Sequence, residues 1–514
     1  MNLNVEGRPV LSEANGRPLT PYKGVGQHKP TGRSSGPPIK TCAQFPPDGN
    51  KCVENLKEAL RNAGLKDGMI VSTHHHFRNG DLVAEQLFMA AKELGVRGLV
   101  WFPSAVFPCH DPLIRFIEDG TIHHIEGSLN GPLGAYASQG KMPGLGVLRS
   151  HGSRYRALQD GDLRVDIAVV AAPSCDHFGN MTGASGPSAC GVLGFAVADA
   201  QFADHVIAIT DNLVDFPCVP WQIAGNHVDQ VVVAGRIGDP EQIVSGTTLV
   251  TRSPERLRIA KLAAAFVSHA GILKDGWSYQ AGAGGTSLAF TIFAAEKMRR
   301  QGVKASFVRG GSTKVVVDML EEGLTPVILD GQTFDLEGVR SVRENPGHIM
   351  TSPFTSYNYH GKGNIASMLD VAMLGATEVD LDFNANVVSH SDGQMLHGIG
   401  GWQDALFSKC TILAVPTFRN RVPIIRESLT TLCGPGELID VVVTERGIAI
   451  NPKRTDLLDA VQGSSLPLRT LGELKAESDQ LCGGSGKLFQ PAGKPVGVVT
   501  WVDGTALDTL YQIS

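Results

Sequence analysis

The sequence predicts an α/β protein of two similar domains, each a mainly parallel sheet covered by helices, with an extended N-terminal arm. Three observations predict this architecture. Short apolar runs rich in β-branched residues alternate with longer amphipathic stretches, as in strands joined by helices. Four segments recur in the same order about 207 residues apart. Of 514 residues, 60 are glycine, which indicates many tight turns and close approaches of backbone to ligand.

Residues 1–45 show neither a helical nor a strand period and are rich in Gly, Pro, Ser and Lys. We interpret them as an arm that is disordered or laid against a partner or neighbouring subunit. The first domain is predicted to span residues 46–250 and the second to span residues 251–514.

Each predicted domain opens with an amphipathic segment. VENLKEALRNAG (53–64) ends at Gly64, a residue typical of helix C-termini, and the buried strand MIVS (69–72) follows. The helix predicted for the second domain is ERLRIAKLAAAFVSHAG (255–271). Further apolar runs predict strands in the first domain at DIAVVAAP (166–173), HVIAIT (205–210) and QVVVAG (230–235).

The internal repeat supports two similar halves. LKDG occurs twice, 208 residues apart, and each copy follows a predicted helix. Ligands of parallel sheets bind at the carboxyl ends of the strands, so two facing halves place a site in the cleft between them. The matching segments begin at Leu65 and Leu273, at Gly95 and Gly302, at Gly191 and Gly398, and near Asp229 and Asp440.

Composition excludes several classes of function. With 45 basic and 51 acidic residues the net charge is −6, which argues against nucleic acid or an anionic membrane as partner. No apolar run reaches the ~18 residues of a membrane-spanning helix. The first residues lack the features of a signal peptide, and the nine cysteines form no C-x-x-C pair. We therefore expect a cytoplasmic protein.

Two glycine-rich turns carry the sharpest chemical signal. They are QAGAGGTSLAF (280–290) and HGIGGWQDA (397–405), and both contain G-x-G-G before a predicted helix. Such turns let main-chain N–H groups approach a negatively charged ligand closely. The alternative is a tight turn with a purely structural role.

Polar side chains in other motifs have two interpretations each. Asn384 and Asn386, in EVDLDFNANVV, hold a carboxylate or carbonyl, or belong to a solvated edge or an Asx turn. Arg154, in SHGSRYR, binds a carboxylate or lies on the surface. His74–His76 lack the partners of a metal motif, so we predict no metal site and interpret them as a polar loop at a strand end, either in the site or outside it. The G-x-S-x-G match GRSSG (32–36) lies in the arm without the strand and helix of a nucleophile elbow, and no P-loop is present.

Taken together, these motifs resemble a known family. Two α/β halves and both G-x-G-G turns are similar to CoA-transferases. More narrowly, the sequence from about Cys52 to the C-terminus resembles the alpha-subunit family of bacterial citrate lyase. The motifs that carry the narrower resemblance are LKDGM, PSCDHFGN, GAGG, FNANV, SDG, GIGG and VTERGIAINP.

The resemblance implies a transferase that converts acetyl-acyl carrier protein and citrate into citryl-acyl carrier protein and acetate. It implies an oligomer with two partners, a lyase (beta) subunit and a gamma subunit, which is a small acyl carrier protein with a CoA-derived arm. No cofactor is expected to be tightly bound, and acetyl-CoA is expected to serve as an alternative donor. The implied roles are oxyanion donors at Gly284, Gly285, Gly400 and Gly401; arm contacts at Gly282, Gly398, Asn384 and Asn386; and citrate contacts at Arg154 and Arg309.

One departure from the family pattern concerns mechanism. CoA-transferases form a thioester on a Glu whose position here falls at about Gly310, and no Glu occurs between Lys304 and Asp318. The resemblance therefore implies direct attack by a carboxylate of citrate in a ternary complex. A substitute nucleophile such as Glu378 or Asp382 is the alternative. Another CoA-transferase, an acyl-CoA hydrolase of the same fold and a catalytically silent scaffold remain open.

Overall fold

The computed structural model describes residues 1–28, 46, 48–243, 248–359, 363–487, 489–491 and 493–513. Its strands form two large sheets and several small ones. Among these residues no helix is long and apolar enough to cross a membrane.

The first large sheet has ten strands, all in parallel pairs except for the hairpin at one edge. Its spatial order is β30 (Ala506–Tyr511), β29 (Pro495–Thr500), β9 (Gly146–Leu148), β8 (Ile122–Gly127), β7 (Leu99–Trp101), β6 (Ile70–Ser72), β10 (Ile167–Ala171), β13 (His205–Thr210), β15 (Gln230–Val233) and β5 (Cys52–Val53).

The second large sheet has eight strands and one antiparallel pair, again at an edge. Its spatial order is β19 (His348–Met350), β18 (Ile328–Thr333), β17 (Ala305–Ser312), β16 (Trp277–Ala281), β20 (Val371–Leu374), β23 (Thr411–Ala414), β27 (Val441–Thr444) and β28 (Gly447–Ile450).

The two sheets share one topology. The order β9-β8-β7-β6-β10-β13-β15 in the first matches β19-β18-β17-β16-β20-β23-β27 in the second, strand for strand in chain order. Each half also has a small three-stranded sheet with the same mixture of pairings. These are β12 (Met181–Thr182), β11 (Ser174–Asp176) and β14 (Leu213–Val214), and β22 (Ala385–Asn386), β21 (Glu378–Asp380) and β26 (Ile425–Arg426).

Equivalent hydrogen bonds support the repeat at the level of single residues. In the first LKDG segment, Asp67 Oδ1 accepts a hydrogen bond from Arg97 N at 2.8 Å. In the second, Asp275 Oδ1 accepts one from Lys304 N at 3.0 Å. Each segment leads into the central strand of its sheet, β6 or β16. The predicted fold class is confirmed.

The helices begin where the sequence provides caps. Asn55 accepts a hydrogen bond from Glu58 N at the start of α1, and Ser253 accepts one from Arg256 N at the start of α7. Both helices end two residues before the predicted boundary, as fraying ends commonly do. The helices are α1 (Leu56–Asn62), α2 (Val83–Glu93), α3 (Ile114–Glu118), α4 (Gly131–Ser138), α5 (His151–Asp160), α6 (Ala196–Phe202), α7 (Pro254–His269), α8 (Gly285–Gln301), α9 (Lys314–Glu321), α10 (Leu336–Glu344), α11 (Pro353–Ser356), α12 (Trp402–Ala405), α13 (Thr455–Ala460) and α14 (Leu471–Cys482).

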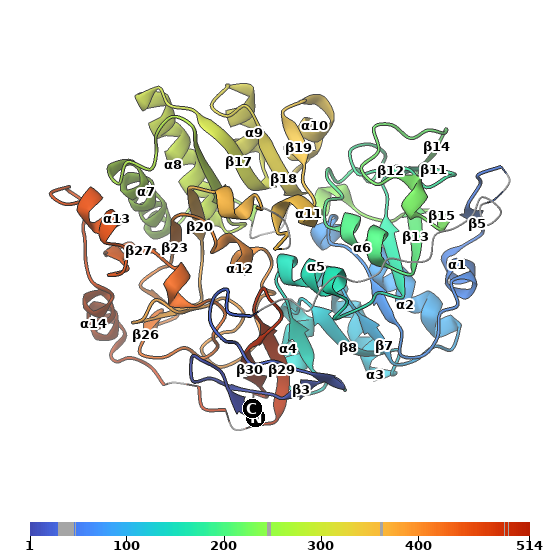
Figure 1. Cartoon of the computed structure of the whole chain (residues 1–514), viewed down its shortest axis with the longest axis horizontal. Helices are drawn as coiled ribbons and strands as arrows, with labels where there is room; N and C mark the ends of the chain where they lie inside the picture. The colour runs from blue at the N-terminus through green and yellow to red at the C-terminus, as the bar shows by residue number, and fades with distance from the viewer. Residues whose placement is uncertain are drawn as a thin grey trace.

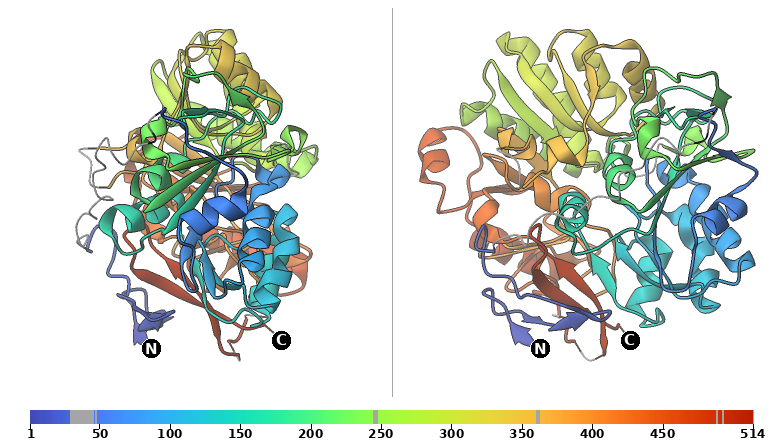
Figure 2. Two further views of the ribbon diagram at one scale, coloured as in Figure 1. Left: turned by 90° about the vertical axis from the view of Figure 1, so that its right-hand side faces the viewer. Right: turned by 45° about the vertical axis from the view of Figure 1, so that its right-hand side comes forward.

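The described part of the N-terminal arm packs against this chain's own C-terminal hairpin. Tyr22 N donates a hydrogen bond to Ala506 O at 2.9 Å, and Ala506 N donates one to Thr20 O at 2.7 Å. The two segments lie side by side in all views (Figures 1 and 2). Within residues 1–28 the strands are two residues long, too short to show a period: β1 (Asn2–Leu3), β2 (Pro9–Val10), β3 (Glu13–Ala14) and β4 (Arg17–Pro18). The rest of the predicted arm, 29–45, lies outside the described residues.

The C-terminal hairpin belongs to the sheet of the first half, because β29 pairs in parallel with β9. The chain therefore returns to its first sheet after completing the second. The domain boundaries given by the sequence stay a prediction.

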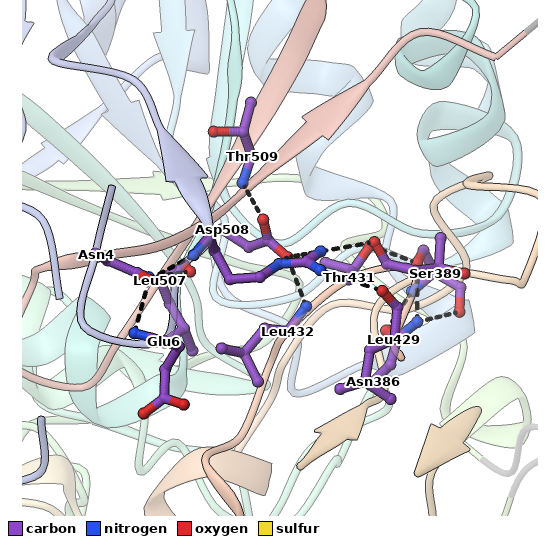
Figure 3. A network of polar contacts seen from close by, with 12 residues as sticks. Asn4, Glu6, Asn386, Ser389, Leu429, Thr431, Leu432, Leu507, Asp508 and Thr509 are labelled. Atoms are coloured by element: carbon purple, nitrogen blue, oxygen red, sulfur yellow. Dashed lines mark hydrogen bonds and ion pairs between the residues drawn. The ribbon is translucent and has the colours of Figure 1, made fainter. Parts of the chain in front are cut away.

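An ion pair connects the arm, the hairpin and the second half (Figure 3). Arg8 Nε and Nη2 donate to Asp508 Oδ2 at 2.9 and 2.6 Å, and Nη2 also donates to Thr430 O at 2.9 Å. The same carboxylate oxygen accepts a hydrogen bond from Leu432 N at 2.6 Å. The Asp508 side chain is only 2% exposed, so its charge depends on these partners.

We expect Arg8→Met to lower the free energy of unfolding by about 2 kcal/mol. The loss is smaller than the ~3–5 kcal/mol of a fully buried pair because Arg8 is 27% exposed. Burial raises the pKa of Asp508, so the loss should shrink as pH falls and the unpaired carboxylate becomes protonated.

Denaturant unfolding at pH 7.5 and pH 5 measures both effects. Arg61→Met, which removes an exposed pair with Glu58, is the control and should change stability by less than about 1 kcal/mol. Equal stability of Arg8→Met and the unmodified chain would contradict the assignment.

Candidate active site

Helix α5 lies between the two halves, near the centre of the molecule (Figure 1). Gly152–Asp160 are all buried. At its N-terminus, His151 N donates a hydrogen bond to Gly400 O at 2.8 Å. The first half thereby meets the second glycine-rich turn of the sequence.

Arg309 is the main charged group that the second half contributes. It lies near the carboxyl end of β17, the edge at which parallel sheets bind ligands. Its Nη1 donates to Gln280 Oε1, and its guanidinium lies 4.7 Å from the ring centroid of Tyr357. Arg309 is only 4% exposed, and within the described part of the chain its Nε has no hydrogen-bond partner. A buried, incompletely paired guanidinium is suited to bind a carboxylate.

The first half contributes two stacked histidines. The rings of His75 and His151 lie 5.1 Å apart with an interplanar angle of 9°. His75 Nε2 is 2.9 Å from Gln332 Oε1, and Nδ1 is 2.6 Å from Ser104 Oγ. Because an amide oxygen only accepts, the hydrogen-bond network assigns the ring proton to Nε2. Gln332 belongs to β18, so this hydrogen bond also joins the halves.

Both histidines are uncharged near neutral pH. Burial, with the nearby Arg154 and Arg309, lowers the pKa of His151 to about 3. Burial and the neighbouring His151 and Arg78 hold the pKa of His75 well below its usual range. The positive charge at this place therefore comes from arginine.

The turn 282–285 begins beside Arg309, because Ala281 and Gly310 are partners in the sheet. Gly285 is the first residue of α8, whose first-turn N–H groups have no partner within the helix. A Cβ atom on Gly284 would meet nothing within 4 Å, so the space above the turn is open. A Cβ atom on Gly285 would lie 2.6 Å from Leu249 O, which excludes any side chain.

The turn 398–401 approaches the same place from the other side. A Cβ atom on Gly401 would lie 3.0 Å from Tyr357 Oη and 3.7 Å from the His151 ring. Gly400 has a φ of +61°, which favours glycine. A Cβ atom on Gly398 would lie 2.0 Å from Ser128 Oγ, so Gly398 is required for packing against the first half. Both predicted glycine turns therefore lie near Arg309.

Arg154 has a different environment from Arg309. Its Nη1 and Nη2 donate to the two carboxylate oxygens of Asp199, both at 2.6 Å, and Nη2 also donates to Phe102 O at 2.9 Å. To bind citrate through the same two nitrogens, Arg154 would have to break its ion pair with Asp199. Its contact with citrate stays a prediction.

Asn384 and Asn386 lie in the small sheet of the second half. Asp380 Oδ1 accepts a hydrogen bond from Asn384 N at 2.9 Å, and Asn384 Oδ1 accepts one from Gly436 N at 2.7 Å. Asn386 Nδ2 donates to Glu378 Oε2 at 3.0 Å. Asn386 Oδ1 also accepts a hydrogen bond from Val388 N at 3.0 Å, which is the Asx turn that the sequence left open. Contact of the two asparagines with an acyl-carrier arm stays a prediction.

The histidine run shows no metal geometry. His74 Nε2 lies 3.2 Å from Asp199 Oδ2, and the rings of His74 and His76 are stacked. The described residues contain no group of three or more His, Cys, Asp or Glu side chains placed to hold a metal ion. A surface hollow of about 450 Å³ lies near Asp275 and Lys304, at the amino ends of β16 and β17. Parallel sheets bind ligands at the opposite edge. The better candidate is therefore the contact between the two halves around Arg309, His75 and His151, which we call the seam.

Sequence reasoning did not assign His151, Gln280, Gln332 and Tyr357 to this site, and it left open whether His74–His76 belong to it. Gln280 could have been noticed because it directly precedes the first glycine turn, and His151 because it precedes Arg154 in SHGSRYR. Tyr357 and Gln332 carry no local signal, since only the packing of the two halves brings them to Arg309 and His75.

Two similar α/β halves with a site between them define the class of CoA-transferase-like proteins. A 4-hydroxybutyrate CoA-transferase from Porphyromonas gingivalis has this fold, with a TM-score of 0.54, 17% identity and coverage of 83% of this chain and 97% of that chain. The family model of the citrate lyase alpha subunit matches residues 49–513. The chain belongs to the citrate lyase alpha-subunit family, as the sequence motifs indicated.

Individual relatives agree with this assignment. The citrate lyase alpha chain of Klebsiella pneumoniae is 39% identical over 497 residues, 96% of each chain. That of Escherichia coli is 37% identical over 90% of this chain and 91% of its own length. A Streptococcus mutans citrate lyase alpha subunit, solved in complex with citrate, superimposes with a TM-score of 0.94 at 36% identity, covering 99% of this chain and 100% of that chain.

We expect the His151 ring to stay neutral from pH 8 down to about pH 4, because burial and two arginines oppose its protonation. Arg309→Met should raise the pKa of His151, since it removes one of these positive charges. NMR titration of the ring carbons, with His151→Gln to assign the signal, measures both. Protonation of His151 near pH 6.5 in the unmodified chain would contradict the described environment.

Proposed function

We propose that this chain is the transferase subunit of a citrate lyase and exchanges acetyl for citryl on the thioester of an acyl carrier protein. Family membership over 49–513 supports this, as does the citrate bound to the Streptococcus mutans relative. The observation that carries it is Arg309, a buried and incompletely paired guanidinium beside both glycine turns. It is the group with which the seam would hold a carboxylate substrate.

We also propose that no enzyme-bound acyl intermediate forms. Gly310 has a φ of +121°, and a Cβ atom on it would lie 3.2 Å from Gln280 Cγ. A glutamate at this position would therefore be strained and crowded. Of the alternative nucleophiles, Glu378 is fully buried and accepts hydrogen bonds from Thr430 N and Oγ1, both at 2.9 Å. Asp382 is exposed, at the end of the small sheet.

The exchange then needs two displacement steps. A carboxylate oxygen of citrate attacks the acetyl carbonyl, the carbon–sulfur bond breaks, and a mixed anhydride and a thiolate form. The thiolate attacks the citryl carbonyl of the anhydride, and acetate leaves. Each step passes through a tetrahedral oxyanion, which hydrogen-bond donors stabilise.

The chain supplies donors and positioning for these steps. Arg309 holds the carboxylate of citrate, and main-chain N–H groups at 284–285 and 400–401 face the oxyanion. His151 is neutral and lies beside Gly401, so it adds no charge that would compete with Arg309 for the carboxylate. Holding both reactants together supplies part of the ~7–11 kcal/mol available from proximity.

The acyl donor and partners follow from the same proposal. The open space above Gly284 suits a flexible thioester arm, with Gly282 and Gly398 as close backbone contacts. The donor is the CoA-derived arm of a small acyl carrier protein (the gamma subunit), and acetyl-CoA serves as its analogue. The complex includes a lyase (beta) subunit that cleaves the citryl thioester, and the chain acts within an oligomer without a tightly bound cofactor.

We expect sequential kinetics. Initial rates of citryl thioester formation, with acetyl-acyl carrier protein or acetyl-CoA and citrate both varied, should give intersecting double-reciprocal lines, because both reactants must be bound at once. Incubation with acetyl-CoA alone followed by borohydride should leave the activity unchanged.

Other outcomes of these assays identify the alternatives. Parallel lines together with reduction of a carboxyl side chain would contradict direct attack. Release of acetate without citrate would indicate a hydrolase. No exchange with either donor would indicate a scaffold.

A further inference from the structure

Two aspartates lie at the same distance before matching strands of the two halves. Asp199 lies seven residues before Val206, and Asp404 lies seven residues before Thr411. Val206 and Thr411 occupy matching positions on β13 and β23, as partners of Ala168 and Ala372 in the two sheets. Both aspartates lie in the short helix that precedes the strand, and both are fully buried.

Both aspartates contact the same helix, α5. Asp199, from the first half, binds the side chain of Arg154 in the interior of α5. Asp404, from the second half, binds the N-terminus of α5: Oδ2 accepts a hydrogen bond from Gly152 N at 3.0 Å, and Oδ1 accepts one from Ser150 Oγ at 3.1 Å. Each half therefore places one buried carboxylate against the helix that lies between them.

Asp404 packs so closely against α5 that a side chain on the facing residue would not fit. A Cβ atom on Gly152 would lie 2.1 Å from Asp404 Oδ1, so only glycine is tolerated there. Tyr359 Oη donates to the same oxygen at 2.9 Å. A carboxylate at a helix N-terminus also interacts favourably with the helix dipole.

Asp404 lies three residues after Gly401, so the same contact sets the position of the second glycine turn. The hydrogen bond from His151 N to Gly400 O runs beside it. Moving Asp404 away from Gly152 would move the turn away from His151 and Tyr357. The distance between the turn and Arg309 would change with it.

We propose that Asp404 is a positioning residue for acyl exchange, which holds the 398–401 turn against α5 so that its N–H groups face the thioester that is attacked by the carboxylate bound to Arg309. This inference rests on the proposed function. Asp404 acts through the turn and does not itself touch the reacting atoms.

Keeping the buried carboxylate of Asp404 ionised lowers the stability of the fold, which a residue with a purely structural role would not require. Burial raises the pKa of Asp404 from 3.8 to about 6, although Gly152, Tyr359, Ser150 and Arg309 oppose the shift. Between these two pH values the folded chain keeps a proton that the unfolded chain has released, so stability falls as pH rises through this window. At pH 7.5 the ionised form is retained at the expense of stability.

The groups that face Asp404 allow its titration to be recognised. They are Tyr357, Tyr359 and Arg309, and His151 adjoins Gly152, whose N–H binds the carboxylate. Burial raises the pKa of both tyrosines and lowers that of His151 to about 3, and arginine stays charged. Among these groups, Asp404 is therefore the one expected to change charge near pH 6.

The test compares Asp404→Asn with the unmodified chain in the exchange assay. We expect kcat to fall about 10- to 100-fold at pH 7.5, as for a displaced catalytic group, with KM for citrate nearly unchanged. The unmodified chain should lose activity as pH falls through about 6, and Asp404→Asn should lack this acid limb. The melting temperature of Asp404→Asn at pH 7.5 should be equal or higher.

Asp440→Asn is the matched control. Asp440 is another buried aspartate of the second half, with a pKa raised by burial, and it accepts a hydrogen bond from Thr411 N away from α5. This variant should lose thermal stability but keep kcat and the acid limb. Tyr359→Phe removes one donor and leaves the carboxylate in place, so it should shift the acid limb to higher pH, and it replaces Asp404→Asn if that variant does not fold.

The outcomes separate the two proposals. Absence of exchange in the unmodified chain refutes the proposed function. Normal exchange in that chain together with normal kcat and an unchanged acid limb in Asp404→Asn overturns only the role of Asp404. An unshifted acid limb in Tyr359→Phe would do the same.

Discussion

The burial of a charged helix between two α/β halves is the constraint on which this structure depends. Helix α5 contains Arg154 and Arg156, both at most 4% exposed, and a buried guanidinium is tolerated only when it is paired. Arg154 is paired with Asp199, and Arg156 with Asp160 and Asp162. Asp404 satisfies the N-terminus of the helix from the other half. The relative placement of the halves is therefore fixed by polar contacts with defined geometry.

The two halves have diverged at the position that matters for chemistry. Val71 and Tyr279 occupy matching places in the sheets, since they pair with Ile167 and Val371. Three residues after these positions, the first half has His74–His76, whereas the second half has the turn that begins at Gly282. The second half thus offers backbone N–H groups and open space, whereas the first half offers ring surfaces. His75 uses that surface to stack on His151 at the seam.

The sequence allowed the fold to be predicted because its signals are local or periodic. Apolar runs marked the strands, and the repeated LKDG segments placed β6 and β16 at equivalent positions. Both glycine turns were found because adjacent glycines are rare without a backbone reason. The site was predicted only in part. Arg309 and the turns were named, but Asp404 and His75 depend on contacts between residues more than 200 positions apart, which no local pattern encodes. Asn386 shows the converse, since an Asx turn and a ligand site have the same sequence signal.

Arg309, at the seam, is the residue proposed to hold the carboxylate of the substrate. Calorimetric titration of citrate into the unmodified chain and into Arg309→Met tests it most directly, with Arg299→Met, which removes an exposed pair with Glu322, as the control. We expect binding by the unmodified chain and by the control. Binding by Arg309→Met should be at least about tenfold weaker with the fold retained, as for loss of a charged hydrogen bond. Equal citrate affinity in Arg309→Met and the unmodified chain would contradict it.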